Sequence, residues 1–192
     1  FISNVEIVLR NNKLQAYDNV DMIYILEKRE DEFFISLNER GVILEYCKIR
    51  NKELAKLYFA IFVKRGVTDF EFPLMALING IQDIEILKEY LTREKLDNFF
   101  SVDSRNKGKI NFSSELNKIY YIDASDNEYN LFSLPNRIFQ TFYASIVKLK
   151  TMKEWLIQLN DANELGDQYE ATLLGYSSEG LSRSDLFVIK EK

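Results

Sequence analysis

The stretch from Phe33 to Lys64 constrains the fold of this chain more than any other. It contains two apolar runs, 33–37 and 42–49, with the β-branched and aromatic composition of strands. Gly41 lies between them and can supply the positive φ that a tight hairpin needs. After Asn51 the apolar residues change from an alternating to a helical period. The stretch therefore predicts a β-hairpin followed by an amphipathic helix.

The predicted helix has signals at both of its ends. Asn51 is the expected N-cap, because its side chain can accept a hydrogen bond from the first turn. Basic residues followed by Gly66 are typical of a helix C-terminus, so we expect the helix to end there. In the preceding strand, simple alternation predicts that Glu45 and Cys47 share one face of the sheet. The apolar face of the helix is expected to contain Leu54, Leu57, Tyr58, Ile61 and Phe62.

A second segment of the same design lies near residues 119–148. Two strand-like runs, 119–123 and 129–134, flank a polar turn, and a long amphipathic helix is expected to begin at Asn136. Its sequence TFYASIVK aligns with LYFAIFVK of the first helix. This alignment favours an internal duplication, but two unrelated amphipathic helices can also align this well, so both interpretations stay open.

Shorter runs complete the expected elements. Residues 22–28 are strand-like, whereas residues 4–9 fit either a strand or a short helix. After Pro73 a helical period continues to about residue 91, with a break near Asp83. Two further hairpins are expected from paired runs, 98–103 with 109–114 and 171–176 with 186–190.

Strands followed by helices, without βαβ alternation, indicate an α+β fold. We expect antiparallel meanders or hairpins, each followed by a packing helix. A chain of 192 residues suits a single domain, 1–192. The internal duplication would divide that domain into two similar halves, about 20–95 and 96–192.

Composition argues against several classes of function. There are 30 acidic and 25 basic residues, and this balance disfavours nucleic-acid binding and docking on anionic membranes. The absence of histidine excludes Ser-His-Asp and Cys-His catalysis and the usual zinc hydrolase sites. The single cysteine, Cys47, lies in an apolar strand, where a buried inert thiol is expected. We therefore expect a protein that is not an enzyme and uses no cofactor or metal.

Acidic residues form the candidate surface for binding a partner. One group clusters in the turn after 119–123, where carboxylates suit a basic partner, a metal or a solvated turn. A second group belongs to an acidic block after the long helix. One tyrosine joins them, because tyrosine is favoured at interface hot spots. The chosen residues are Asp123, Asp126, Glu128, Asp161, Glu164, Asp167 and Tyr120.

The turn Glu39-Arg40-Gly41 between two strands, followed by Leu57-Tyr58 in a helix, resembles a family of small bacterial immunity proteins that accompany polymorphic toxins. The similarity covers residues 33–66. It implies a non-catalytic protein that binds a cognate toxin from the same cell and blocks it. The toxin would present a basic cleft to the acidic surface.

Two other hypotheses stay open. The chain starts at Phe1, so a signal or anchor before it would make this the extracellular domain of a surface protein or lipoprotein. A membrane would then be contacted only through that anchor, whereas the immunity hypothesis favours the cytoplasm. An enzyme using two carboxylates, in the manner of a glycosidase, is the third hypothesis, although no such pair stands in apolar surroundings.

Overall fold

The computed structural model describes residues 5–18, 22–123 and 125–159. These residues form two compact units, one reaching Thr68 and the other beginning at Asp69. The sequence repeat would instead divide the chain at 95/96, and whether the chain is one domain of two similar halves stays a prediction. The expected hairpin of 171–176 with 186–190 lies outside the described residues, as do Asp161, Glu164 and Asp167.

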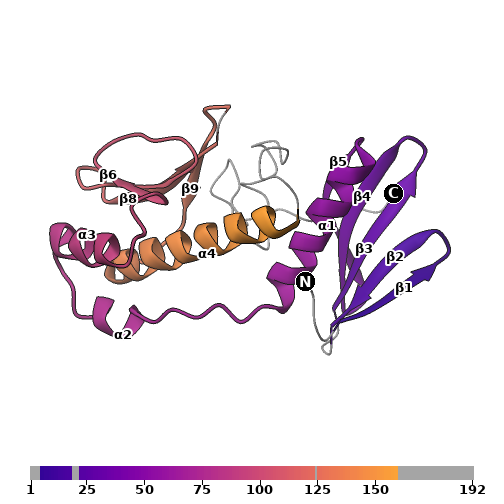
Figure 1. Cartoon of the computed structure of the whole chain (residues 1–192), viewed down its shortest axis with the longest axis horizontal. Helices are drawn as coiled ribbons and strands as arrows, with labels where there is room; N and C mark the ends of the chain where they lie inside the picture. Colours follow the sequence, from indigo (N-terminus) through magenta and orange to yellow (C-terminus); the bar gives the residue numbers. More distant parts are fainter. Residues whose placement is uncertain (1–4, 19–21, 124, 160–192) are drawn as a thin grey trace. The chain divides into compact units, whose positions relative to one another are not determined.

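The first unit is a five-stranded antiparallel meander followed by a helix (Figure 1). Each strand pairs with the next in sequence order. The elements are β1 (Glu6–Arg10), β2 (Lys13–Tyr17), β3 (Met22–Arg29), β4 (Glu32–Glu39), β5 (Val42–Ile49) and α1 (Lys52–Val67). The hairpin and helix predicted for 33–64 are therefore confirmed.

The start of this sheet resolves the ambiguity of residues 4–9 in favour of a strand. β1 turns into β2, which sequence reasoning missed, through Asn11 and Asn12 at φ angles of 49° and 61°. Two positive φ angles in a two-residue turn define the type I′ hairpin, and asparagine tolerates this conformation better than most residues. The Asn-Asn pair was the available signal.

α1 packs on β3, β4 and β5 and forms the core of this unit. The Phe62 ring lies 5.5 Å from the ring centre of Tyr24 and 4.5 Å from that of Tyr46. The N-cap prediction is confirmed, since the Asn51 side chain accepts a hydrogen bond from the Leu54 amide at 2.9 Å. The expected C-terminus is wrong, because Gly66 lies inside a helix that extends to Val67.

Gly66 has a packing role instead. A Cβ at this position would lie 1.9 Å from the hydroxyl oxygen of Tyr24, which is itself only 2% exposed. The helix therefore approaches the sheet at a distance that only glycine permits.

A β-bulge corrects the expected alternation in β5. Leu44 pairs with Leu37 and Glu45 with Ser36, but the register shifts before Cys47, which pairs with Ile35. The extra residue places Glu45 and Cys47 on opposite faces, so the predicted shared face is wrong. Because the bulge inserts one residue, a period of two could not reveal it.

The second unit combines three helical segments, a mixed four-stranded sheet and a final long helix (Figure 1). The break near Asp83 is confirmed, with Asp83 as N-cap of α3. The long helix begins after a 3-10 turn and not at Asn136. The elements are α2 (Met75–Ile78), α3 (Ile84–Arg93), β6 (Phe100–Val102), β7 (Ile110–Ser113), β8 (Lys118–Ile122), β9 (Glu128–Leu131), η1 (Pro135–Arg137) and α4 (Ile138–Leu159).

The hairpin predicted for 98–103 with 109–114 is wrong, because β6 and β7 pair parallel. The short connection turns back on itself and is tied down by the buried side chain of Asn111. Its amide oxygen accepts a hydrogen bond from the Asn106 amide at 2.8 Å, and its amide nitrogen donates to the carbonyls of Asn106 and Lys109. Parallel strands are usually joined by a long crossover that contains a helix, whereas here these side-chain bonds hold a short connection. Such bonds produce no hydrophobic periodicity, so the sequence pattern did not reveal the parallel pairing.

α4 covers one face of this sheet. Phe142 of α4 packs against Phe112 of β7 at 5.5 Å and against Phe100 of β6 at 6.0 Å. Since neighbouring strand residues point to opposite faces, Asn111 and Tyr120 belong to the other face. Segment 103–109 lies on that other face, where it meets Asn111. The whole fold is α+β, as predicted, and among the described helices none is long and apolar enough to cross a membrane.

Candidate functional site

A buried carboxylate organises the turn between β8 and β9. Asp123 is 0% exposed and accepts hydrogen bonds from the Asn127 amide at 2.8 Å, the Asn127 side chain at 2.9 Å and the Tyr129 hydroxyl at 2.9 Å. Burial alone would raise its pKa, but these donors outweigh burial and hold the pKa of Asp123 below its ordinary value. Asp123 was a candidate for partner contact, and its position makes it the support of the turn.

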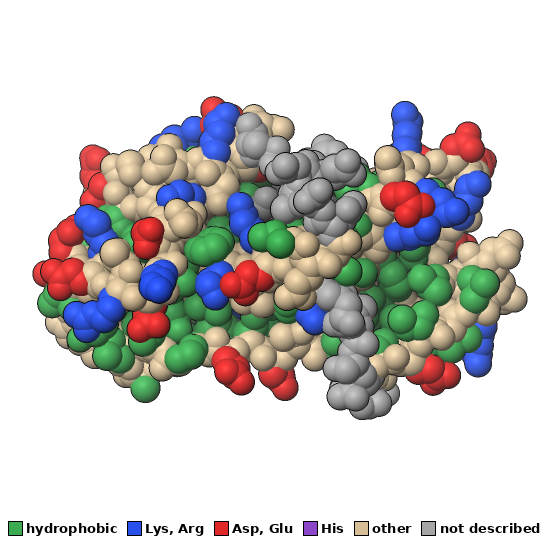
Figure 2. Space-filling view, in the orientation of Figure 1, with side chains coloured by type: hydrophobic (Ala, Val, Ile, Leu, Met, Phe, Trp, Pro, Cys, Tyr) green, Lys and Arg blue, Asp and Glu red, His purple; other side chains and the backbone are tan. Residues whose placement is uncertain are grey.

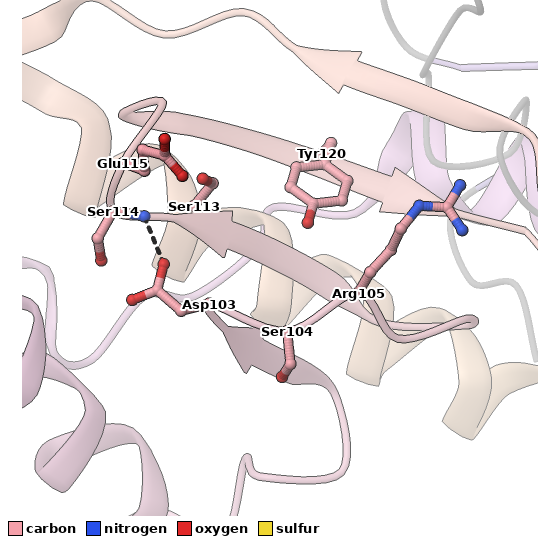
Figure 3. A pocket seen from close by; sticks show the side chains of 7 residues that line it. All are labelled: Asp103, Ser104, Arg105, Ser113, Ser114, Glu115 and Tyr120. Carbon is pink, nitrogen blue, oxygen red and sulfur yellow. Dashed lines mark hydrogen bonds between the residues drawn. The ribbon is translucent and has the colours of Figure 1, made fainter.

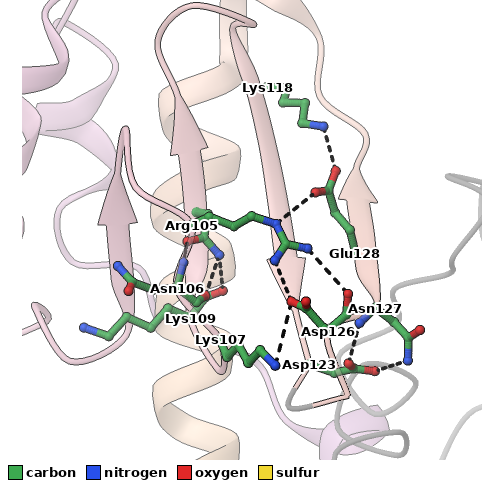
Figure 4. A network of polar contacts seen from close by, with 10 residues as sticks. Arg105, Asn106, Lys107, Lys109, Lys118, Asp123, Asp126, Asn127 and Glu128 are labelled. Atoms are coloured by element: carbon green, nitrogen blue, oxygen red, sulfur yellow. Dashed lines mark hydrogen bonds and ion pairs between the residues drawn. The ribbon is translucent and has the colours of Figure 1, made fainter.

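Asp126 and Glu128 of the same hairpin form ion pairs with cations from segment 103–109 and from β8 itself (Figure 4). Arg105 pairs with Asp126, and Lys107 lies 3.9 Å from the same carboxylate. Lys118 of β8 pairs with Glu128 at 2.7 Å. The hydrogen bond from Arg105 lowers the pKa of Asp126, so this carboxylate is ionised at neutral pH.

This arrangement changes the electrostatics predicted for the hairpin. The sequence showed a group of carboxylates, whereas the structure places cations beside them. Sequence reasoning missed Arg105 because it lies 21 residues from Asp126 and on a segment expected to form an ordinary hairpin turn. The site is therefore a mixed polar surface with nearly balanced charge.

Tyr120 lies beside this network on the side of the sheet away from α4. Tyr120 is 8% exposed, and the Lys118 ammonium lies 4.9 Å from the centre of its ring. Most of the ring is thus covered, and its remaining edge faces an open groove of about 520 Å³ (Figure 3). The groove is lined by Asp103, Ser104, Arg105, Ser113, Ser114, Glu115 and Tyr120.

One hydrogen bond joins two parts of the groove's rim. The Asp103 carboxylate accepts a hydrogen bond from the Ser114 amide at 2.7 Å, which joins the end of β6 to the end of β7 (Figure 3). This bond lowers the pKa of Asp103 below its ordinary value. Hydroxyls, carboxylates and one guanidinium surround a single aromatic ring, a lining that offers hydrogen bonds and charge. Small-molecule sites are more enclosed and more apolar than this.

The Glu39-Arg40-Gly41 turn joins β4 to β5, and its sequence is explained by the backbone conformation that it adopts. Arg40 and Gly41 have φ angles of 51° and 87°, and the Asn38 side chain accepts a hydrogen bond from the Gly41 amide at 2.9 Å. Two positive φ angles identify a type I′ turn, which explains the glycine. Beside it lies a second open groove, of about 540 Å³, lined by Tyr17, Asp18, Met22, Ile23, Asn38, Arg40 and Gly41.

The helical part of the family-like motif belongs largely to the core. Leu57 is half-buried and Tyr58 is fully buried, with its ring stacked 6.3 Å from that of Phe62. Tyr58 also contacts the Cys47 thiol, and burial raises the pKa of Cys47 to about 12. A thiol with such a pKa is uncharged at neutral pH, which agrees with the expected low reactivity, although Cys47 is half-buried and not fully buried.

Comparisons with known proteins add no family. No protein-family model, curated protein or solved structure matches this chain. Among the described residues, His, Cys, Asp and Glu do not gather into a group of three that could hold a metal ion.

Proposed function

We propose that this chain is a non-enzymatic binding protein, and that its partner is a protein toxin of the same bacterial cell. The observation that carries the proposal is the β8–β9 hairpin, where the buried Asp123 holds Asp126 and Glu128 at the surface in one arrangement. A surface ordered before binding loses little conformational entropy when it meets a partner. Such rigidity suits a protein that occludes another protein's cleft.

The ion pairs on the hairpin do not prevent this contact. The pair of Arg105 with Asp126 is about half exposed, and exposed pairs contribute only about 0–1 kcal/mol. A cation of the toxin can therefore replace Arg105 or Lys107 at the carboxylate at little cost. Arg105 would then be released toward the groove beside Tyr120, and arginine and tyrosine are both favoured at interface hot spots.

The toxin identity rests on the resemblance of residues 33–66 to immunity proteins. In the structure this segment is the β4–β5 hairpin with α1, and it belongs to the first unit. Its turn borders the groove that contains Tyr17, Met22 and Ile23, which offers a partner apolar contacts. Each unit therefore offers one candidate surface for a partner, the β8–β9 hairpin in the second unit and this groove in the first.

The test is binding of the full chain to the protein encoded by the adjacent gene. We expect the two to co-purify, and titration calorimetry to give a dissociation constant below micromolar. The variants Asp126→Asn and Glu128→Gln keep side-chain size but remove charge, and each should weaken binding about tenfold. Asparagine also tolerates the positive φ of 72° at position 126.

Glu85→Gln is the matched control, since Glu85 is an exposed carboxylate paired with Lys88 at 3.1 Å on α3. It should leave the affinity unchanged. A neighbour that forms no complex at micromolar concentration would contradict the proposed function. Tight binding that ignores both hairpin variants would instead contradict the proposed surface.

A further inference from the structure

β1 is an edge strand of the first unit's sheet in the part of the chain that the structure describes. Among the described residues it pairs only with β2, and it exposes two large apolar side chains, Ile7 at 55% and Leu9 at 72%. Figure 2 shows hydrophobic side chains at the surface over the strands β1 to β3. An edge strand with exposed apolar residues and free backbone groups is a template for another strand.

The turn into β2 determines which backbone groups face the open edge. Residues that flank a two-residue type I′ turn exchange backbone hydrogen bonds, and here these residues are Arg10 and Lys13. Hydrogen-bonded pairs alternate along an antiparallel ladder. The backbone groups of Arg10, Val8 and Glu6 therefore point to β2, and those of Ile7 and Leu9 point outward.

The sequence of β1 is Glu-Ile-Val-Leu-Arg. When two copies of this strand lie antiparallel, the acidic end of each lies opposite the basic end of the other, and the apolar residues lie opposite one another. We propose that β1 pairs antiparallel with β1 of a second copy of this chain, centred on Val8, and so forms a symmetric homodimer. The residues of this interface differ from those of the proposed toxin-binding hairpin.

In this register every outward backbone group finds a partner. Ile7 lies opposite Leu9 of the second copy, and the two residues exchange both of their backbone hydrogen bonds; symmetry repeats this on the other side of Val8. The exposed side chains of Ile7 and Leu9 lie on one face and cover each other. On the opposite face Glu6 meets Arg10 of the second copy, where side chains of the non-hydrogen-bonded pairs are closest.

Other registers are worse. Centring the pair on Ile7 or on Leu9 removes the Glu6–Arg10 pairing and leaves outward backbone groups beyond the overlap. The opposite charges of Glu6 and Arg10 therefore favour a second copy of this chain as the partner strand of β1. Two short strands bury less than the area of a standard stable interface, so we expect a dimer with a dissociation constant in the micromolar range.

The test is a charge-swap series on the full chain, measured by sedimentation velocity over a range of concentrations. Wild type should convert from monomer to dimer as concentration rises. Glu6→Arg and Arg10→Glu each place like charges opposite each other at two symmetric positions, and each should weaken the dimer about tenfold. The double variant Glu6→Arg/Arg10→Glu restores both pairs and should dimerise like wild type.

An equimolar mixture of the two single variants gives the most specific test of the Glu6–Arg10 pairing. One chain then carries a basic side chain at both positions of the pair, and the other carries an acidic side chain at both. The mixture should therefore form a heterodimer, although each variant alone is mostly monomeric. Lys52→Glu, an exposed charge reversal on α1, is the control and should dimerise normally. A monomer at every concentration, or a dimer that ignores the swaps, would overturn the proposal.

Discussion

The β4–β5 hairpin with α1 and the β8–β9 hairpin with α4 share one order of elements but are ordered by different means. The first uses backbone conformation, with positive φ at Arg40 and Gly41 and a two-residue turn. The second uses a buried carboxylate, Asp123, whose hydrogen bonds hold a longer turn. Similar patterns of strand and helix thus conceal two sources of stability, one conformational and one electrostatic.

The sheets around these hairpins differ as well. In the first unit every strand pairs antiparallel with its neighbour, whereas in the second β6 and β7 pair parallel. The duplication stays a prediction, since the two units share the hairpin and helix but not the strands before them. In the second unit the buried side chains of Asp123 and Asn111 hold the connections between strands by hydrogen bonds. In the first unit the backbone conformation of the two-residue turns holds them.

The largest expected effect comes from removing the negative charge that holds the turn between β8 and β9. Asp123→Asn turns one acceptor oxygen into a donor that faces the Tyr129 hydroxyl and the Asn127 amide group. Because the hydrogen bonds that the buried carboxylate accepts are then weakened or lost, we expect a loss of about 2–3 kcal/mol in the free energy of unfolding. Urea denaturation at pH 7 measures it, and an unchanged midpoint would show that the carboxylate does not hold the turn.

The pH dependence supplies the control. The folded pKa of Asp123 is lowered, so its stabilisation is present above the ordinary value of 3.8 and is lost as pH falls through the folded value. The stability difference between wild type and Asp123→Asn should therefore shrink in acid. Burial and then the bond to Asp123 raise the pKa of Tyr129 to about 12, and ultraviolet titration should place it lower in the variant.

A smaller effect tests the close packing of the first unit. Gly66→Ala would place a Cβ 1.9 Å from the Tyr24 hydroxyl oxygen, and the buried Tyr24 ring would have to move. Overpacking costs about 1–3 kcal/mol, which exceeds the gain of about 0.5–1 kcal/mol from alanine in a helix. Thermal denaturation should show the net loss. Gly80→Ala, whose nearest contact would be 3.7 Å away, should be close to neutral.

The smallest expected effect comes from changing the backbone preference of the turn between β4 and β5. A Cβ at Gly41 would meet nothing within 4 Å, so Gly41→Ala is disfavoured only by its φ of +87°. We expect a loss of about 1 kcal/mol in the free energy of unfolding, measured in urea. Gly41→Asn should lose less, because asparagine tolerates positive φ, as Asn11 and Asn12 do in the first turn. Equal losses for both variants would argue against a conformational cause.

The sequence by itself determined the local elements. Alternation, the Asn51 cap and Gly41 predicted the β4–β5 hairpin and α1, because these signals act within a few residues. The α+β class followed from the order of those elements. Part of the candidate site was also visible, since Asp126 lies in a recognisable turn and Glu128 directly follows it.

Only the tertiary structure decided how these elements meet. The parallel pairing of β6 with β7, the burial of Asp123 and the approach of Gly66 to Tyr24 depend on residues far apart in the chain. The same holds for the cations at the carboxylates, because Arg105 reaches Asp126 across the sheet. A local pattern carries no information about such contacts, since their energies depend on which side chains the fold brings within a few ångströms of each other.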